Sequence, residues 1–251
     1  MTKKLLFAIV AVIAFAFTVS SCIKGESGPA ENYIQDYFTV DGIYPTYTLY
    51  SDHGYTVYLT SESVSQLPGG KGFDGHKRVN LLLSYTDENV IESDKDVIIR
   101  NAVIQSGQYM DEKDPLTIEQ ANGQKQLEED SLFIVETLFY DTQYGVRIAP
   151  WVGAKQYINI PCYAGYAYDG KGVYPTFNLT YDPATFKENE AEVTFLYNRH
   201  CAKTYNSIYY QAFETTFPMA SIIRQVPGSD SVVVTINTKG KEPVKVKMGR
   251  F

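Results

Sequence analysis

The most restrictive pattern in this sequence is a long series of short segments rich in tyrosine, threonine and β-branched residues, separated by turn signals. Residues 37–51 and 55–60 flank Asp52-His53-Gly54, which predicts a β-hairpin because glycine accepts the positive φ of a tight turn. Pro227-Gly228-Ser229-Asp230 marks another turn near the C-terminus. The 21 tyrosines suit pleated, half-buried surfaces, and no helical run is long enough to cover a sheet. The sequence therefore predicts an all-β fold.

The predicted strands fall into two groups. Residues 33–106 hold four or five short strands, the right number for a small barrel. From residue 106 to 130 the pattern changes to acidic and polar residues, which places a domain junction there. Residues 107–251 begin with this acidic connecting segment and continue as an antiparallel β-sandwich. Its expected strands span residues 131–140, 145–152, 156–168, 176–181, 192–198, 208–216, 221–225, 231–238 and 244–248.

The N-terminus has the form of a bacterial lipoprotein signal. Lys3 and Lys4 precede an apolar run from residue 5 to 17, and Val19-Ser20-Ser21-Cys22 follows. The run is too short to be read as a membrane span, and it is apolar all round, unlike an amphipathic helix at the start of a domain. We therefore expect a signal peptide over residues 1–21, lipid attachment at Cys22 and a flexible tether over residues 22–32.

Charge and cysteine content limit the partners and the compartment. Without its signal the chain has 20 basic and 29 acidic residues, a formal charge of −9. Nucleic acid is disfavoured as a partner because its phosphates require clustered Lys and Arg. Outside the reducing cytoplasm Cys162 and Cys201 are able to pair in a disulfide, although two buried free thiols on neighbouring strands fit equally well.

Motifs for catalysis, metals and cofactors are absent from the sequence. Gly70-Lys71-Gly72-Phe73-Asp74-Gly75 matches the dinucleotide fingerprint only formally, because no strand precedes it and no helix follows it. No zinc spacing and no G-x-S-x-G nucleophile elbow occurs. We expect no catalytic residues, no metal ligands and no cofactor. The densest aromatic cluster, Tyr163-Ala164-Gly165-Tyr166-Ala167-Tyr168, suits either a sugar-stacking surface or core and edge packing.

The chain resembles the NigD-like lipoproteins of Bacteroidetes in the order of its parts. The resemblance is carried by Cys22, the hairpin over residues 42–60, Gly75-His76-Lys77-Arg78-Val79-Asn80-Leu81, Gln156-Tyr157-Ile158-Asn159-Ile160 and Phe217-Pro218-Met219-Ala220-Ser221-Ile222. It implies an OB-like N-terminal barrel followed by a β-sandwich. A link of the family to bacteriocin operons also implies immunity as a role.

These observations together predict a cell-envelope protein that is anchored by lipid, and we expect the anchor to lie in the outer membrane. Its partners are the membrane, through the lipid, and a glycan or an envelope protein, through a non-catalytic binding surface. Two alternatives stay open. One is a glycan-processing hydrolase, which converging carboxylates in a deep cleft would favour; the other is a bacteriocin immunity protein, which a large exposed apolar patch would favour.

Overall fold

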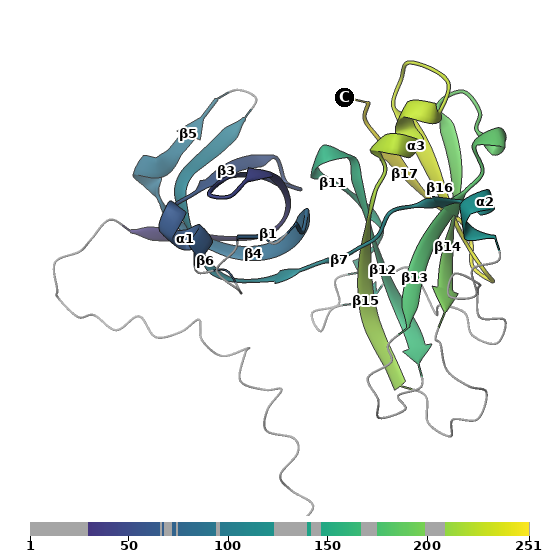
Figure 1. Ribbon diagram of the computed structural model, residues 1–251, viewed down its shortest axis with the longest axis horizontal. Helices are drawn as coiled ribbons and strands as arrows, with labels where there is room; N and C mark the ends of the chain where they lie inside the picture. The colour runs from purple at the N-terminus through teal and green to yellow at the C-terminus, as the bar shows by residue number, and fades with distance from the viewer. Residues whose placement is uncertain are drawn as a thin grey trace, which may run out of the picture. The chain divides into compact units, whose positions relative to one another are not determined.

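The computed structural model describes residues 30–65, 67, 72–73, 75–93, 96–122, 140–141, 147–166, 175–198 and 209–250 (Figure 1). Glu31–Phe251 forms one compact unit, and its described residues hold two separate hydrophobic cores. Nearly all regular structure is strand, so the predicted all-β class is confirmed. Among these residues no helix is both long and apolar enough to cross a membrane.

The first core is enclosed by a five-stranded barrel. Strands β3, β2, β1, β4 and β6 pair in this order, and a parallel pairing between β3 and β6 closes the ring. Helix α1 lies between β3 and β4 in the chain, an OB-like connectivity, and β5 adds a short hairpin beside β6. The bounds are β1 Glu31–Ile43, β2 Thr46–Ser51, β3 Tyr55–Leu59, α1 Ser61–Ser65, β4 Arg78–Thr86, the 3-10 turn η1 Asp87–Asn89, β5 Val90–Glu92 and β6 Val97–Tyr109.

The predicted hairpin is present and the barrel interior follows its alternation. Strands β2 and β3 pair antiparallel around Gly54, which has a φ of +94°. Every second residue of β4 (Val79, Leu81 and Leu83) is buried, as period-two side-chain geometry requires. Strand β6 continues to Tyr109, past the barrel end predicted at residue 106, because its last residues keep pairing with β4 past a β-bulge.

The second core lies between two sheets that form the sandwich. One sheet has the order β11-β12-β15-β7 and the other the order β17-β16-β14-β13-β8. Both are mixed sheets, since the pairings β7–β15, β8–β13 and β14–β16 are parallel. The bounds are β7 Asp111–Glu112, β8 Leu116–Thr117, α2 Ile118–Ala121, β9 Tyr140–Asp141, β10 Arg147–Ile148, β11 Trp151–Gly153, η3 Ala154–Gln156, β12 Tyr157–Tyr166, β13 Thr176–Tyr181, η4 Pro183–Thr185, β14 Glu190–Asn198, β15 Tyr209–Pro218, α3 Ala220–Gln225, β16 Val232–Thr238 and β17 Val244–Met248.

One predicted strand is wrong and another cannot be compared. Residues 221–225 form helix α3 because Met219, Ile222, Ile223 and Val226 recur at three- and four-residue spacing, and all four are at most 3% exposed. A strand would have buried only alternate residues. Helix α2 spans Ile118–Ala121, and Thr117 and Gln120 form its capping box. Of the strand predicted over residues 131–140, all but Tyr140 lies outside the described residues.

Candidate functional site: an aromatic strip on the sandwich

The residues that the sequence singled out lie in different places. Cys22 and Cys201 lie outside the described residues. Cys162 is in β12, is 1% exposed and belongs to the sandwich core, where burial raises the pKa of its thiol. The Cys162–Cys201 pairing therefore stays a prediction. The described residues contain no group of three or more His, Cys, Asp or Glu side chains placed to hold a metal ion.

A buried ion pair of the barrel, Arg78 and Asp52, makes hydrogen bonds to residues of the sandwich. The Arg78 guanidinium donates to both carboxylate oxygens of Asp52, at 2.8 and 2.7 Å, and neither side chain is more than 2% exposed. The guanidinium also donates to Thr39 Oγ1 at 2.9 Å and to Asn159 Oδ1 at 3.0 Å. It lies 5.2 Å from the centroid of the Tyr157 ring. Both terminal nitrogens of Arg78 thus have acceptors and the guanidinium faces an aromatic ring, conditions under which a buried charge is tolerated, although the buried Nε has no hydrogen-bond partner among the described residues.

Asp52 is the point where several strands meet. Its carboxylate accepts hydrogen bonds from Trp151 Nε1 at 3.0 Å, the Ala154 backbone N–H at 2.8 Å and Asn159 Nδ2 at 3.1 Å. Asp52 belongs to the first predicted turn, where a polar residue reads as solvated turn chemistry. The structure instead buries it, so this network gives the barrel a fixed attachment to β11 and β12.

Strands β12 and β15 extend from this network and place aromatic residues on one outer face. Asn159 lies opposite both Trp151 and Thr216, and Pro161 opposite Glu214; Tyr163 and then Gly165 follow on the same face of β12. Directly opposite residues share a face of the sheet, and every second residue repeats it. Tyr210 lies opposite Gly165 and therefore also belongs to this face. The even-numbered residues of β12 from Ile158 to Ala164 point the other way, into the core.

Two tyrosines on this face form a stacked pair that is open to solvent. The ring centroids of Tyr163 and Tyr210 are 5.9 Å apart and the rings are inclined by 22°. Tyr163 is 38% exposed and Tyr210 is 51% exposed. At the other end of the face, Tyr37 of the barrel packs on Trp151 with centroids 5.2 Å apart. We call Tyr37, Trp151, Tyr163 and Tyr210 the aromatic strip. Along β12 the face runs from Asn159 to Gly165, six residue steps that span about 20 Å.

Glu214 lies in the row between the two aromatic pairs. Its Oε2 accepts a hydrogen bond from the Tyr37 hydroxyl at 3.0 Å, whereas its Oε1 is buried and has no hydrogen-bond partner among the described residues. Burial raises the pKa of Glu214 to about 7, and the hydrogen bond from Tyr37 and the charge of Arg78 oppose the rise. Glu214 therefore holds a strip tyrosine and changes its charge near neutral pH.

A hollow of about 370 Å³ borders Glu214 on the side of β7. Asp111 and Lys113 also line it, and Phe177 and Phe213 supply apolar walls. Asp111 Oδ2 lies 3.4 Å from the Lys113 ammonium and accepts from the Thr215 hydroxyl at 3.2 Å. Lys113 also donates to the Phe177 carbonyl at 3.1 Å. The charged groups of this hollow are therefore bound largely to one another.

Comparison with known proteins places the fold. No family model and no curated protein sequence matches the chain. Similar solved structures include a Bacteroides fragilis protein named as a lipoprotein, with 10% identity, a TM-score of 0.58 and coverage of 87% of this chain and 99% of that chain. A Parabacteroides distasonis protein named as toxin-related has 15% identity, a TM-score of 0.52 and coverage of 87% and 94%. These two similarities show a shared fold.

The structural neighbours also include a NigD-like immunity protein from Bacteroides caccae, with 14% identity, a TM-score of 0.45 and coverage of 87% and 93%. The barrel and the sandwich that the resemblance implies are both present in the structure.

Sequence reasoning found only part of the strip. The cluster at residues 163–168 included Tyr163, whereas Tyr168 lies outside the described residues. Tyr37, Trp151, Tyr210 and Glu214 were missed. The alternation of β15 was the one available signal for Tyr210, because Tyr210, Ala212 and Glu214 share a face once the segment is read as a strand.

Proposed function

We propose that this protein is a lipid-anchored, non-catalytic envelope protein that binds glycans on the aromatic strip. The observation that carries the proposal is the exposed, stacked pair of Tyr163 and Tyr210 beside the barrel contact of Tyr37 and Trp151. The lipoprotein signal ending at Cys22 supports attachment to the outer membrane through lipid. A B. fragilis protein named as a lipoprotein has the same fold, which is consistent with this location.

The chemistry of the strip suits sugars better than other ligands. A tyrosine ring offers a flat apolar face to the C–H side of a sugar, and its hydroxyl bonds to polar groups at the edge. Each tyrosine adds large contact area at a low cost in side-chain entropy. The excess of acidic residues, 29 against 22 basic ones, disfavours polyanionic ligands. A neutral oligosaccharide lying along the strip therefore fits both its shape and its charge.

Removing the stacked pair should abolish most of the glycan affinity. We expect Tyr163→Ala and Tyr210→Ala each to weaken binding by about two- to thirteenfold, because one aromatic contact contributes about 0.5–1.5 kcal/mol. The measurement is a glycan array with the mature chain carrying Cys22→Ser, followed by titration calorimetry of any glycan bound. Tyr58→Ala is the matched control, since Tyr58 is 40% exposed but lies in the barrel strand β3. Equal affinity of the strip variants and this control would refute the proposed surface.

Anchoring should depend on Cys22. We expect Cys22→Ala to move the protein from the membrane fraction to the soluble fraction, because the two or three acyl chains on this residue hold the protein in the membrane. No described helix is long and apolar enough to cross a membrane. Metabolic labelling with a palmitate analogue, compared between the wild type and the variant, measures the modification directly. Persistent labelling of the variant, or an unlabelled wild type, would contradict lipid attachment at this residue.

A glycan-processing hydrolase is the second candidate, because Glu214 and Asp111 line one hollow and the pKa of Glu214 is raised to about 7. A general acid of this kind must reach the glycosidic oxygen. Glu214 Oε1 is enclosed and Oε2 is bound to Tyr37, which favours binding over cleavage. Release of reducing ends by the wild type but not by Glu214→Gln would reverse this preference.

A further inference from the structure

The outer face of the barrel has a row of uncharged polar side chains beside Tyr37. Tyr37 of β1 lies opposite Asn80 of β4, and Asn80 lies opposite Gln108 of β6. Directly opposite residues share a face of a sheet, so these three side chains point to the same side. Val79 and Leu81, the neighbours of Asn80 in β4, are buried in the barrel core. The row therefore lies on the outside of the barrel.

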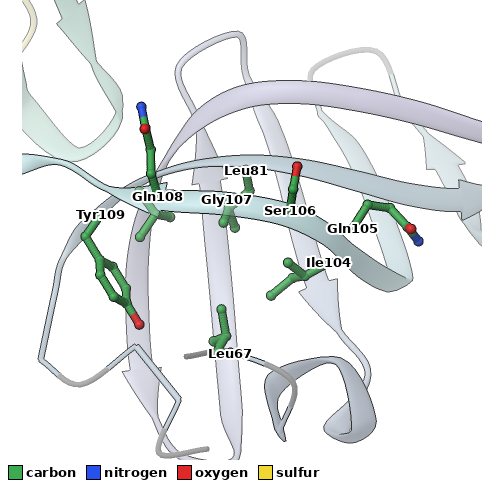
Figure 2. Close-up of a pocket in the computed structure, with 9 residues that line it drawn as sticks. Leu67, Leu81, Ile104, Gln105, Ser106, Gly107, Gln108 and Tyr109 are labelled. Carbon is green, nitrogen blue, oxygen red and sulfur yellow. The ribbon is translucent and has the colours of Figure 1, made fainter. Parts of the chain in front are cut away.

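A second row runs beside the first and completes a shallow hollow. Gln35 lies opposite Leu82, and Leu82 lies opposite Ser106. Figure 2 shows Ser106 and Gln108 directed away from the side of β6 on which Tyr109 lies. The two rows line a hollow of about 270 Å³ on the outer surface. We call its side chains the amide face, which consists of Gln35, Asn80, Leu82, Ser106 and Gln108.

The amide groups of this face are available to a ligand. Gln35 and Gln108 are exposed and Asn80 is half-buried, and none of the three makes a side-chain hydrogen bond to another described residue. Each amide carries two N–H donors and an acceptor oxygen. The described residues that line the hollow carry no charge. A neutral ligand with many hydroxyl groups therefore matches this face, because every hydroxyl also both donates and accepts.

A tyrosine stands at each end of the amide face along β1. Tyr33 and Tyr37 flank Gln35 at two-residue spacing, so all three side chains share the outer face. The Tyr33 ring is 59% exposed, and its hydroxyl donates to Glu31 Oε2 at 2.9 Å. The two tyrosines are four residues apart, about 13 Å along a strand. Flat rings on either side of free amides suit a sugar chain, whose C–H faces stack and whose hydroxyls form hydrogen bonds.

The amide face is continuous with the aromatic strip. Tyr37 belongs to the strip through its contacts with Trp151 and Glu214, and it begins the first row of the amide face. One residue thus takes part in both surfaces. A glycan that stacks on the strip and passes Tyr37 next meets Asn80 and then Gln108.

We propose that the amide face is the specificity site for this glycan, where Gln35, Asn80 and Gln108 form hydrogen bonds to the hydroxyl groups of a neutral sugar. The inference rests on the proposed function, because it takes the ligand to be the glycan that stacks on the strip. The strip supplies ring contacts, which most sugars satisfy, whereas the amides distinguish one arrangement of hydroxyls from another. An acidic sugar is disfavoured here, since its carboxylate would meet no cation in the lining of the hollow.

The test is affinity electrophoresis of the mature chain carrying Cys22→Ser in native gels that contain starch, xylan, galactomannan, yeast mannan or polygalacturonate. We expect at least one neutral polysaccharide to retard the wild type and the acidic polygalacturonate not to. Asn80→Ala should weaken that affinity by about two- to thirteenfold, the effect of one lost hydrogen bond. Asn237→Ala is the matched control and should change nothing, because Asn237 is a half-buried amide on the sandwich strand β16.

Two further variants separate this inference from the proposed function. The triple variant Gln35→Ala, Asn80→Ala and Gln108→Ala should weaken binding by about tenfold or more, and Gln108→Glu replaces it if its circular dichroism spectrum is no longer native. Loss of affinity in the amide variants, with retention in Asn237→Ala, supports the amide face.

Tyr163→Ala with Tyr210→Ala is the second of these variants. Unchanged affinity in the amide variants, with loss in this strip variant, overturns the amide face and leaves the proposed function intact. Loss in the amide variants alone supports the amide face and overturns the strip as the stacking surface. A wild type that no neutral polysaccharide retards, or that binds polygalacturonate more tightly, overturns the inference and the proposed neutral glycan together.

Discussion

Asp52→Ala is expected to lower the free energy of unfolding by about 3–5 kcal/mol, the usual cost of removing one partner of a buried ion pair. Among the described residues, the substitution would leave the fully buried Arg78 guanidinium with Thr39 and Asn159 as its acceptors. It would also remove the acceptor for Trp151 and for the Ala154 backbone N–H. Urea denaturation followed by tryptophan fluorescence measures this loss, because Trp151 is the only tryptophan in the chain.

A second substitution separates the charge effect from lost packing. Adding Arg78→Met to Asp52→Ala removes the unpaired charge, so the double variant should be more stable than Asp52→Ala alone. Arg100→Met provides the control for losing an arginine, since Arg100 is exposed on β6, and it should change stability by less than about 0.5 kcal/mol. If Asp52→Ala proved as mild as Arg100→Met, the buried network around Asp52 would not hold the barrel to the sandwich as described.

The second large effect concerns pH and Glu214. Burial raises the pKa of Glu214 from 4.5 to about 7 in the folded chain, so the folded state binds this proton more tightly than the unfolded state does. The stability that the proton contributes is fully present below pH 4.5 and is lost as the pH rises through 7. The expected loss is about 3 kcal/mol. Glu214→Gln should lack it, because the amide does not ionise.

Unfolding curves of the wild type and Glu214→Gln at pH 5 and pH 8 measure this effect, and the difference between the two proteins cancels the other carboxyl groups. We expect Glu214→Gln to be the more stable protein at pH 8, and its advantage to shrink at pH 5. A constant difference between the proteins would show that Glu214 does not titrate in this range. Tyr37→Phe removes the hydrogen bond that favours the ionised form of Glu214. In this variant the loss of stability with rising pH should therefore occur at a higher pH than in the wild type.

The fold was largely predictable because the local strand and turn signals of the sequence agree with the strands that form. The bounds of β13 and β17 match the prediction at both ends, since Asp182-Pro183 and Lys239-Gly240 are clear local stop and turn signals. Helix α3 was misread because Ile222 and Ile223 are β-branched neighbours in a short segment, where helical and strand patterns are hard to separate. Met219 and Val226, which flank the helix, are buried as well, and this burial depends on the surrounding sheets.

The site was less predictable because it depends on contacts between distant residues. Tyr37 and Glu214 are 177 positions apart, and Asp52 meets Asn159 across 107 positions. No local pattern distinguishes Asp52 from a solvated turn residue. Strand pairing between β12 and β15 brings Tyr163 and Tyr210 together, and this register is decided by the packing of the opposite face.

The most direct test of glycan binding on the strip is a hydrogen-exchange footprint of the mature chain, with and without solubilised envelope polysaccharide. The aromatic strip predicts slower amide exchange in β12 over Pro161–Tyr166 and in β15 over Tyr209–Glu214, with no change in β2 and β3. The same experiment on the chain with Tyr163→Ala and Tyr210→Ala should show no protection. Protection confined to the barrel, or a footprint that survives in the double variant, would contradict a glycan-binding strip on the sandwich.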